Sequence, residues 1–136
     1  MFSFKNHDNN LYNTLLALSR NSFFYKTVGL KDSFETRIYL MFIHFSILMI
    51  IFKKKGSKLD QKIYDSFFYN IEYNLRELGF GDVTVNKKMK DLNKILYDIL
   101  LKINKSSDKL IINKNLVLKY FKDLDNSNFN KYKLFE

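Results

Sequence analysis

Apolar residues between positions 59 and 78 recur with the spacing of one face of an α-helix. They stand at successive steps of four, four, four, four and three: Leu59, Ile63, Phe67, Ile71, Leu75 and Leu78. Ser57 can cap the N-terminus of this helix, and Asp60 in its first turn suits the helix dipole. Gly79 can take the left-handed conformation that ends a helix, and Gly81 then permits a second bend.

A second amphipathic stripe begins directly after this bend. Its apolar residues alternate between steps of four and three: Val85, Met89, Leu92, Leu96, Ile99 and Ile103. Asp82 or Thr84 can cap a helix that starts near Val85. The pattern therefore predicts two helices joined by a short turn that contains glycine.

The most hydrophobic run of the chain is Ile38–Phe52. Asp32 or Ser33 can cap the helix that contains it. A transmembrane helix needs about 20 apolar residues, and this run is shorter and includes His44. We interpret it as the central helix of a bundle, with a peripheral membrane contact left open.

The remaining segments give weaker patterns. Asn10–Arg20 is predicted to form a first helix, followed by a short helical turn over Ser22–Tyr25. Leu110–Leu124 is interpreted as a last long helix, in preference to a hairpin of residues 110–112 and 116–118. The sequence thus predicts a single-domain, all-α bundle of about five helices over residues 10–124. We expect residues 1–9 to form a loose N-terminal tail and residues 125–136 a polar C-terminal tail.

The composition narrows the possible functions. The 136 residues include no cysteine, no proline and only two histidines, and the net charge is +9. The absence of cysteine excludes disulfides and thiolate metal sites, and with so few histidines we expect no metal. The positive charge favours an anionic partner such as RNA, a ribosome or an acidic membrane surface. The alternative is that lysine is simply the default surface residue of a protein encoded by an AT-rich genome.

Polar residues lie on or beside the apolar face of the predicted 59–78 helix: Asp65, Asn70, Glu72, Arg76 and Glu77. They form either a solvated flank of the helix or a polar network between helices with Arg76 as its hub. If Arg76 were a buried, paired charge, its replacement by Ala would destabilise the fold strongly, whereas an exposed Arg76 would matter little.

Three strings in this part of the chain resemble the core signature of the ubiquinol–cytochrome c chaperone family. They are Gln61-x-x-x-Asp65-x-x-Phe68, Leu75-Arg76-Glu77-Leu78-Gly79-x-Gly81-Asp82, and Val85-x-Lys87-Lys88-Met89-Lys90. The resemblance covers residues 11–97. The three arginines, Arg20, Arg37 and Arg76, also fall where the family pattern has arginine.

The resemblance implies a chaperone that assists assembly of the cytochrome bc complex (complex III) and acts on newly made cytochrome b or another subunit of the complex. Family members occur in alphaproteobacteria and in mitochondria, where they work with a small partner protein at the ribosomal exit. The resemblance implies a cytoplasmic location at the inner face of the bacterial inner membrane, or a location on the matrix side in a mitochondrion. The expected motif residues of a polar scaffold are Arg37, His44, Gln61, Asp65, Arg76, Glu77, Gly79, Gly81 and Asp82.

Two groups of lysines are candidates for a partner-binding face: Lys53, Lys54 and Lys55 after the central helix, and Lys87, Lys88, Lys90 and Lys94 beside the second stripe. They form a solvated surface, or they contact RNA, the ribosome, a membrane or acidic loops of a client. The alternative to a chaperone is therefore a basic helical protein that binds RNA or the ribosome.

The sequence carries no catalytic signature. It lacks a glycine-rich phosphate loop, a nucleophile elbow and a dinucleotide fingerprint. His44 has no nucleophile or acid at a spacing that would make it a general base, and we interpret it as a hydrogen-bonded core residue. We expect neither enzymatic activity nor a cofactor or small-molecule substrate.

Overall fold

The computed structural model describes residues 10–56, 60–106, 109–112 and 114–122. Its elements, in chain order, are α1 (Asn10–Ser19), the π-helical turn η1 (Phe23–Thr27), α2 (Phe34–Lys54), α3 (Gln61–Glu77), α4 (Asp82–Lys102), β1 (Ile103–Ser106), β2 (Lys109–Ile112) and α5 (Lys114–Tyr120). The predicted all-α, single-domain bundle of five helices is confirmed. The expected tails, residues 1–9 and 125–136, lie outside the described residues.

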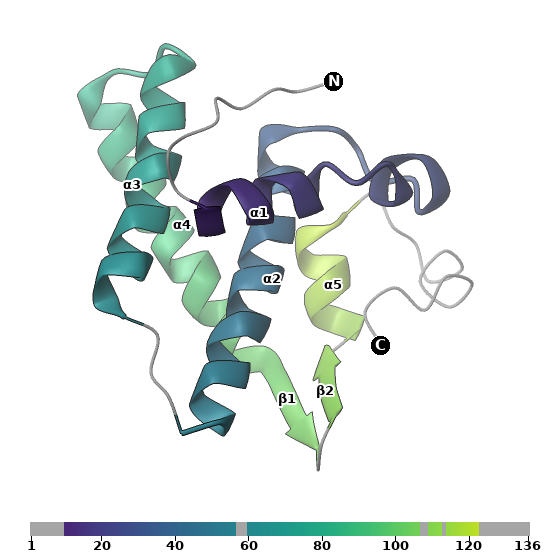
Figure 1. The fold of residues 1–136 in the computed structure, drawn as a ribbon. Coiled ribbons are helices and arrows are strands. Elements are labelled where there is room, and N and C mark those ends of the chain that lie inside the picture. Colours follow the sequence, from purple (N-terminus) through teal and green to yellow (C-terminus); the bar gives the residue numbers. More distant parts are fainter. Residues whose placement is uncertain (1–9, 57–59, 107–108, 113, 123–136) are drawn as a thin grey trace.

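Helix α2 is the element on which the others pack. In Figure 1, α1 lies across α2, the α3–α4 pair lies on one side of it and α5 lies on the other. Both α1 and α4 contact α2 extensively, and α3 contacts α4 and α1. Tyr39 of α2 meets Tyr120 of α5 and the adjoining Phe121, with ring centroids 5.2 Å and 6.3 Å away.

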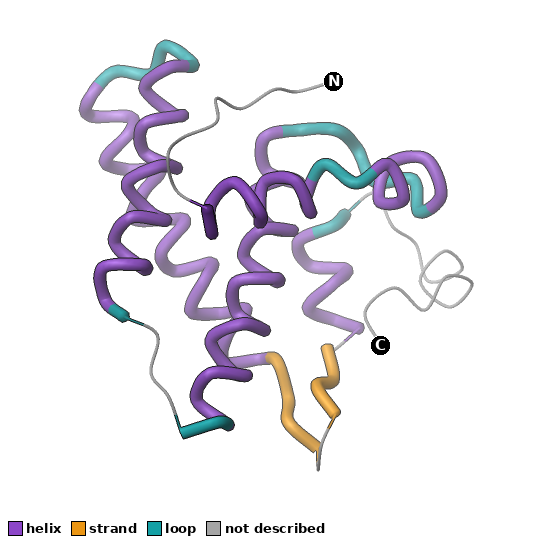
Figure 2. The backbone as a smooth tube through the Cα atoms, viewed as in Figure 1, coloured by secondary structure: helices purple, strands orange, loops and turns teal. Residues whose placement is uncertain are grey.

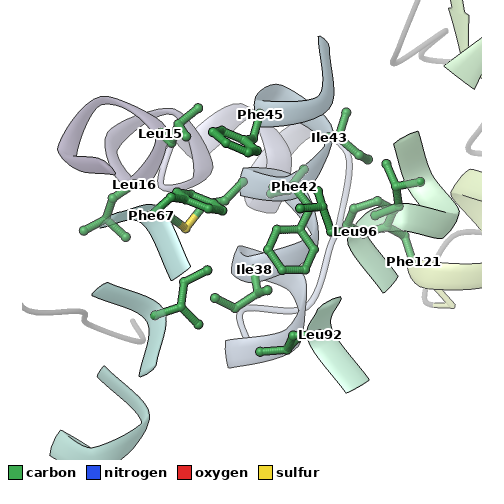
Figure 3. Close-up of a cluster of buried hydrophobic side chains, with 14 of the residues drawn as sticks. Leu15, Leu16, Ile38, Phe42, Ile43, Phe45, Phe67, Leu92, Leu96 and Phe121 are labelled. Carbon is green, nitrogen blue, oxygen red and sulfur yellow. The ribbon is translucent and has the colours of Figure 1, made fainter. Parts of the chain in front are cut away.

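Aromatic rings fill the space between α2 and α3. The rings of Phe45 and Phe67 stack in parallel with centroids 4.4 Å apart, and Phe42 contacts both Phe67 and Phe68. Figure 3 shows Phe42, Phe45 and Phe67 in this cluster. All three are almost completely inaccessible to solvent. Such ring pairs add to the stabilisation that burial itself provides, and they fix α3 on the central helix.

The predicted central helix is confirmed and extends beyond the apolar run at both ends. By length and composition α2 could span a membrane, with a mean hydropathy of 1.6 in its most apolar window, but 56% of that window is buried within the protein. The buried residues of α2 include the charged Arg37. The helix therefore has the burial of a core helix, in agreement with the interpretation from the sequence.

The helix caps agree with the sequence in part. The Ser33 side chain accepts a hydrogen bond from the Thr36 amide at 3.2 Å, so Ser33 is the cap of α2. The cap of α3 is Asp60, which accepts from the Lys62 amide at 3.0 Å, whereas the predicted cap Ser57 lies outside the described residues. The predicted start of α4 is wrong, because this helix begins at Asp82 with Gly81 as a cap that has no side-chain oxygen.

The segment after α4 differs from both predictions. Strands β1 and β2 form an antiparallel hairpin in which Ile103 pairs with Ile112, and α5 is only 7 residues long (Figure 2). The long helix over Leu110–Leu124 is therefore wrong, and so is the alternative hairpin, because residues 116–118 are helical. The β-branched Ile111 and Ile112 favour the extended conformation over continuation of a helix.

Candidate functional site

The turn between α3 and α4 exposes apolar side chains at one end of the bundle. Leu78 is 43% exposed and Phe80 39% exposed. Helix α3 ends at Glu77 with Leu78 as its C-cap. Gly79 then adopts the left-handed conformation with φ +97°, and the Phe80 amide donates to the Leu75 carbonyl at 3.4 Å. We call residues 76–82 together with Lys88 the α3–α4 tip.

Arg76 connects the two helices at this tip. Its Nη1 donates to the Asp82 carboxylate, and its Nη2 lies 3.4 Å from Glu72 Oε1, one turn earlier on α3. The hydrogen bond with Asp82 raises the pKa of Arg76. The two carboxylates therefore link the last turn of α3 to the first residue of α4 through the Arg76 guanidinium.

Lys88 of α4 contacts one of these apolar residues, Phe80. Its Nζ is 4.9 Å from the centroid of the Phe80 ring, which is a cation–π contact. The α3–α4 tip therefore combines the exposed side chains of Leu78 and Phe80 with two cations, Arg76 of α3 and Lys88 of α4. This arrangement suits an apolar segment with adjacent negative charge, and it offers no group placed for acid–base or nucleophilic chemistry.

The polar core predicted from the sequence is wrong for four of its residues. Asp65, Arg76, Glu77 and Asp82 are all exposed. Gln61 is also exposed and donates to Asp65 Oδ1 at 2.9 Å on the surface of α3. Arg76 does join α3 to α4, but as the centre of an exposed ion-pair cluster.

The buried charge is Arg37 instead. Its side chain is completely buried, with Nε and Nη2 3.0 Å and 2.9 Å from the same Asp32 oxygen. The guanidinium also lies 5.1 Å from the centroid of the Tyr25 ring, and the Tyr25 hydroxyl donates to the Ser19 carbonyl at 2.6 Å. This cluster joins α1, η1 and α2, and it is closed by packing and not open to a ligand.

A second buried polar cluster was predicted only in part, because the proposed polar network included Asn70 but neither Asn74 nor Tyr12. Asn74 of α3 hydrogen-bonds the Tyr12 hydroxyl of α1 and donates to the Asn70 carbonyl at 3.0 Å. Burial raises the pKa of the Tyr12 hydroxyl. The signal available in the sequence was that Asn70 and Asn74 share the helical phase of Phe67 and Ile71, which places them at the core.

His44 is half-buried, and its Nδ1 donates to the Leu40 carbonyl 2.7 Å away in the same helix. Its ring meets Phe24 edge-on at 6.1 Å. This is the hydrogen-bonded packing role expected from the sequence. No group of three His, Cys, Asp or Glu side chains that could hold a metal ion occurs among the described residues.

The predicted basic residues lie on two separate surfaces. Lys53, Lys54 and Lys55 are exposed at the end of α2, next to Ile51 and Phe52, which are 39% and 37% exposed. On α4, Lys87, Lys90 and Lys94 are exposed, whereas Lys88 is half-buried against the tip. The two lysine groups therefore do not form one continuous basic face.

Comparison with known proteins gives one match. The model of a protein family described as ubiquinol-cytochrome C chaperone matches residues 26–116, which is more than half of the chain. No curated protein and no solved structure matches the chain. The matched range includes α2, α3, α4 and the whole α3–α4 tip.

Proposed function

The chain belongs to the ubiquinol–cytochrome c chaperone family, and on this premise we propose that it binds newly synthesised cytochrome b during assembly of the cytochrome bc complex. Family membership itself indicates a role as an assembly chaperone of complex III and not as an enzyme. The identity of the client and the surface that binds it are our proposal. We place the client site at the α3–α4 tip.

The observation that carries this proposal is the exposure of the motif around the tip. Leu78 and Phe80 keep 43% and 39% of their surface exposed, whereas Leu75 in the preceding turn is completely buried. An exposed apolar pair beside two oriented cations is a common feature of protein-binding surfaces. A hydrophobic client segment would cover these side chains until it is inserted into the complex.

The strength of such a contact suits transient binding. Complete burial of a Leu or Phe side chain contributes about 1.5–3 kcal/mol, so covering the exposed part of Leu78 and of Phe80 contributes roughly 1 kcal/mol each. Two such contacts and a pair of cation contacts give weak binding, which permits release. A chaperone has to hand its client on, so tight binding at this site would oppose its function.

Location at a membrane is a second part of the proposal. Ile51 and Phe52 stand next to Lys53, Lys54 and Lys55, and all five are exposed. Exposed apolar residues next to a lysine cluster suit peripheral binding to an anionic leaflet. We place the protein at the cytoplasmic face of a bacterial inner membrane, or on the matrix side in a mitochondrion.

The test is a pull-down of the tagged full chain from its own membranes and ribosomes, followed by mass spectrometry. The wild type is expected to enrich cytochrome b, and the double variant Leu78→Ser/Phe80→Ser is expected to lose it. Tyr69→Ser is the matched control, because Tyr69 is 64% exposed on α3 and lies outside the tip. Circular dichroism confirms that each variant is folded.

Two outcomes would contradict the proposal. Equal capture of cytochrome b by the wild type and the tip variant would remove the α3–α4 tip as the client site. Enrichment of ribosomal proteins or RNA alone, with a steep dependence on salt, would favour the alternative of a basic RNA- or ribosome-binding protein. Recovery of cytochrome b only with the wild type and the Tyr69 control would support both the client and the site.

A further inference from the structure

The outward face of α4 carries a regular row of six side chains. They follow one another at steps of four, three, four, three and four: Val83, Lys87, Lys90, Lys94, Tyr97 and Leu101. At about 100° per residue they all lie within roughly 40° of one line along the helix, opposite the buried residues. Every one of the six is exposed. We call this row the α4 stripe.

The ends of the α4 stripe are apolar. Val83 is 85% exposed and Leu101 80% exposed, more than any other large apolar residue in the described part of the chain. Tyr97, one turn before Leu101, is 54% exposed. Single exposed apolar residues are ordinary, but these three share one helical line, with Tyr97 also reaching Tyr64 of α3.

The centre of the stripe is positively charged. Lys87, Lys90 and Lys94 make no ion pair within the described residues, whereas Lys102 on the neighbouring side of α4 pairs with Asp98 at 2.8 Å. Like charges three and four residues apart on a helix repel one another, as Lys90 does with Lys87 and with Lys94, and Asp91 at these spacings from Lys87 and Lys94 offsets the repulsion in part. An anionic partner would remove this repulsion as it binds.

We propose that the α4 stripe docks one amphipathic helix of a partner protein that carries acidic residues at its centre and apolar residues at its two ends. Steps of four and three average 3.5 residues, which is the spacing by which two helices pack side by side. From Val83 to Leu101 the stripe is about 27 Å long, the length of an 18-residue helix. The central lysines then face the acidic residues, and the apolar ends contact each other.

Other occupants fit this row less well. A membrane-surface helix presents a continuous apolar face, but here lysines separate Val83 from Leu101. Nucleic acid would neutralise the lysines through its phosphates and leave both apolar ends uncovered. In an antiparallel pair of copies of this chain Lys90 would face Lys94, so self-association would add repulsion.

The proposal concerns a surface separate from Leu78 and Phe80, and it does not require the client to be cytochrome b. Its first test uses a designed probe: a labelled 21-residue helical peptide with leucines at both ends and three central glutamates on one face. Fluorescence anisotropy measures the binding of this peptide to the full chain at low and moderate salt. A permuted peptide of the same composition, with these residues spread around the helix, is the control peptide.

We expect the probe to bind about tenfold more tightly than the permuted peptide, because only the probe presents its charged and apolar residues on one face. Lys90→Glu/Lys94→Glu should weaken the binding of the probe about tenfold or more, and Leu101→Ser should weaken it about threefold. The matched control is Lys31→Glu/Lys62→Glu, which reverses two exposed charges away from the stripe and should change the affinity less than about twofold. Equal binding of both peptides, or no effect of the stripe variants, would overturn the proposal.

The second test identifies the occupant in cells. A photo-crosslinking amino acid replaces Tyr97 in the stripe, and in a control strain it replaces Tyr69 on α3. The expected product is a crosslink from position 97 alone to one protein, mapped to a helical segment with central acidic residues. Crosslinks only to lipid, to RNA or to a second copy of this chain, or none at all, would overturn the proposal. Loss of cytochrome b capture in the tip variant tests the client site independently, so the two proposals fail separately.

Discussion

Replacement of Arg37 by Ala should destabilise the protein by about 3 kcal/mol. Removing one partner of a buried ion pair costs roughly 3–5 kcal/mol, because the other charge is left without compensation. The remaining carboxylate, Asp32, is 25% exposed, so water can hydrate it in part, and this places the estimate at the lower end. The variant also loses the cation–π contact with Tyr25.

A second substitution separates charge from volume. Arg37→Met fills most of the space that the arginine occupies, so the loss should fall to about 1–2 kcal/mol, mainly because the Asp32 carboxylate loses its contacts with the guanidinium. If Arg37→Met and Arg37→Ala were equally destabilising, the charge would account for the effect. If the Arg37→Met variant were as stable as the wild type, lost packing would account for the destabilisation by Arg37→Ala.

Urea unfolding followed by the helical circular dichroism signal measures both variants. With a urea m-value of about 2 kcal/mol/M, Arg37→Ala should lower the unfolding midpoint by about 1.5 M without changing the m-value. Arg76→Ala is the informative control, because its guanidinium is 43% exposed and its partner Asp82 is 81% exposed. It should unfold close to the wild-type midpoint. A larger shift for Arg76→Ala than for Arg37→Ala would refute the assignment of the buried charge.

Two further predictions concern α4 and the turn before it. Hydrogen bonds from Lys102 and Tyr120 hold the pKa of Asp98 well below its ordinary value of 3.8, so the stabilisation it provides is complete above about pH 4 and is lost as the pH falls. The difference in unfolding free energy between the wild type and Asp98→Asn should therefore shrink below pH 4, and a constant difference in urea titrations from pH 6 to pH 2 would contradict this. Gly79→Ala should destabilise the fold by about 1–2 kcal/mol because φ is +97°, although the space around it is open. Gly81→Ala, at φ −76°, should cost clearly less, and urea unfolding measures both variants.

Much of the helical core could be predicted from apolar spacing alone. Ile71 and Leu75, taken from the first stripe, are completely buried, and so is Ile99 from the second. A helix that packs by one face repeats its apolar residues every 3.6 positions, so the pattern itself identifies the buried side. The central helix was recognisable for a different reason, because an apolar run of its length is buried on nearly every side.

The burial of the arginines could not be predicted in this way. Arg76 shares the α3 helix with buried residues, yet it lies in the last turn, where the chain bends away toward α4 and the side chain stays 43% exposed. Arg37 lies in the first turn of α2, where a charged residue is usually solvated. It is buried because η1 brings Tyr25 over it, and that contact depends on tertiary packing and not on local spacing.

The C-terminal segment shows the same limit. Ile103 continues the apolar spacing of α4, and it is indeed buried, but as the first residue of β1. Its strand partner Ile112 follows nine positions later, and short apolar runs of this kind fit either a strand or a helix. The pairing between the two strands decides the conformation, and this pairing cannot be predicted from the apolar spacing within either segment.

The two surfaces proposed for α4 and the turn before it should respond differently to ionic strength, which allows them to be studied in one protein. Binding at the α4 stripe depends on Lys87, Lys90 and Lys94, which are exposed and therefore strongly screened by salt. Binding at the α3–α4 tip depends mainly on Leu78 and Phe80, and salt does not weaken the burial of apolar surface. A partner that salt releases would thus be assigned to the α4 stripe, and a client that stays bound in salt would be assigned to the α3–α4 tip. The rigid packing of α3 and α4 on α2 is what allows so small a domain to keep both surfaces in fixed positions.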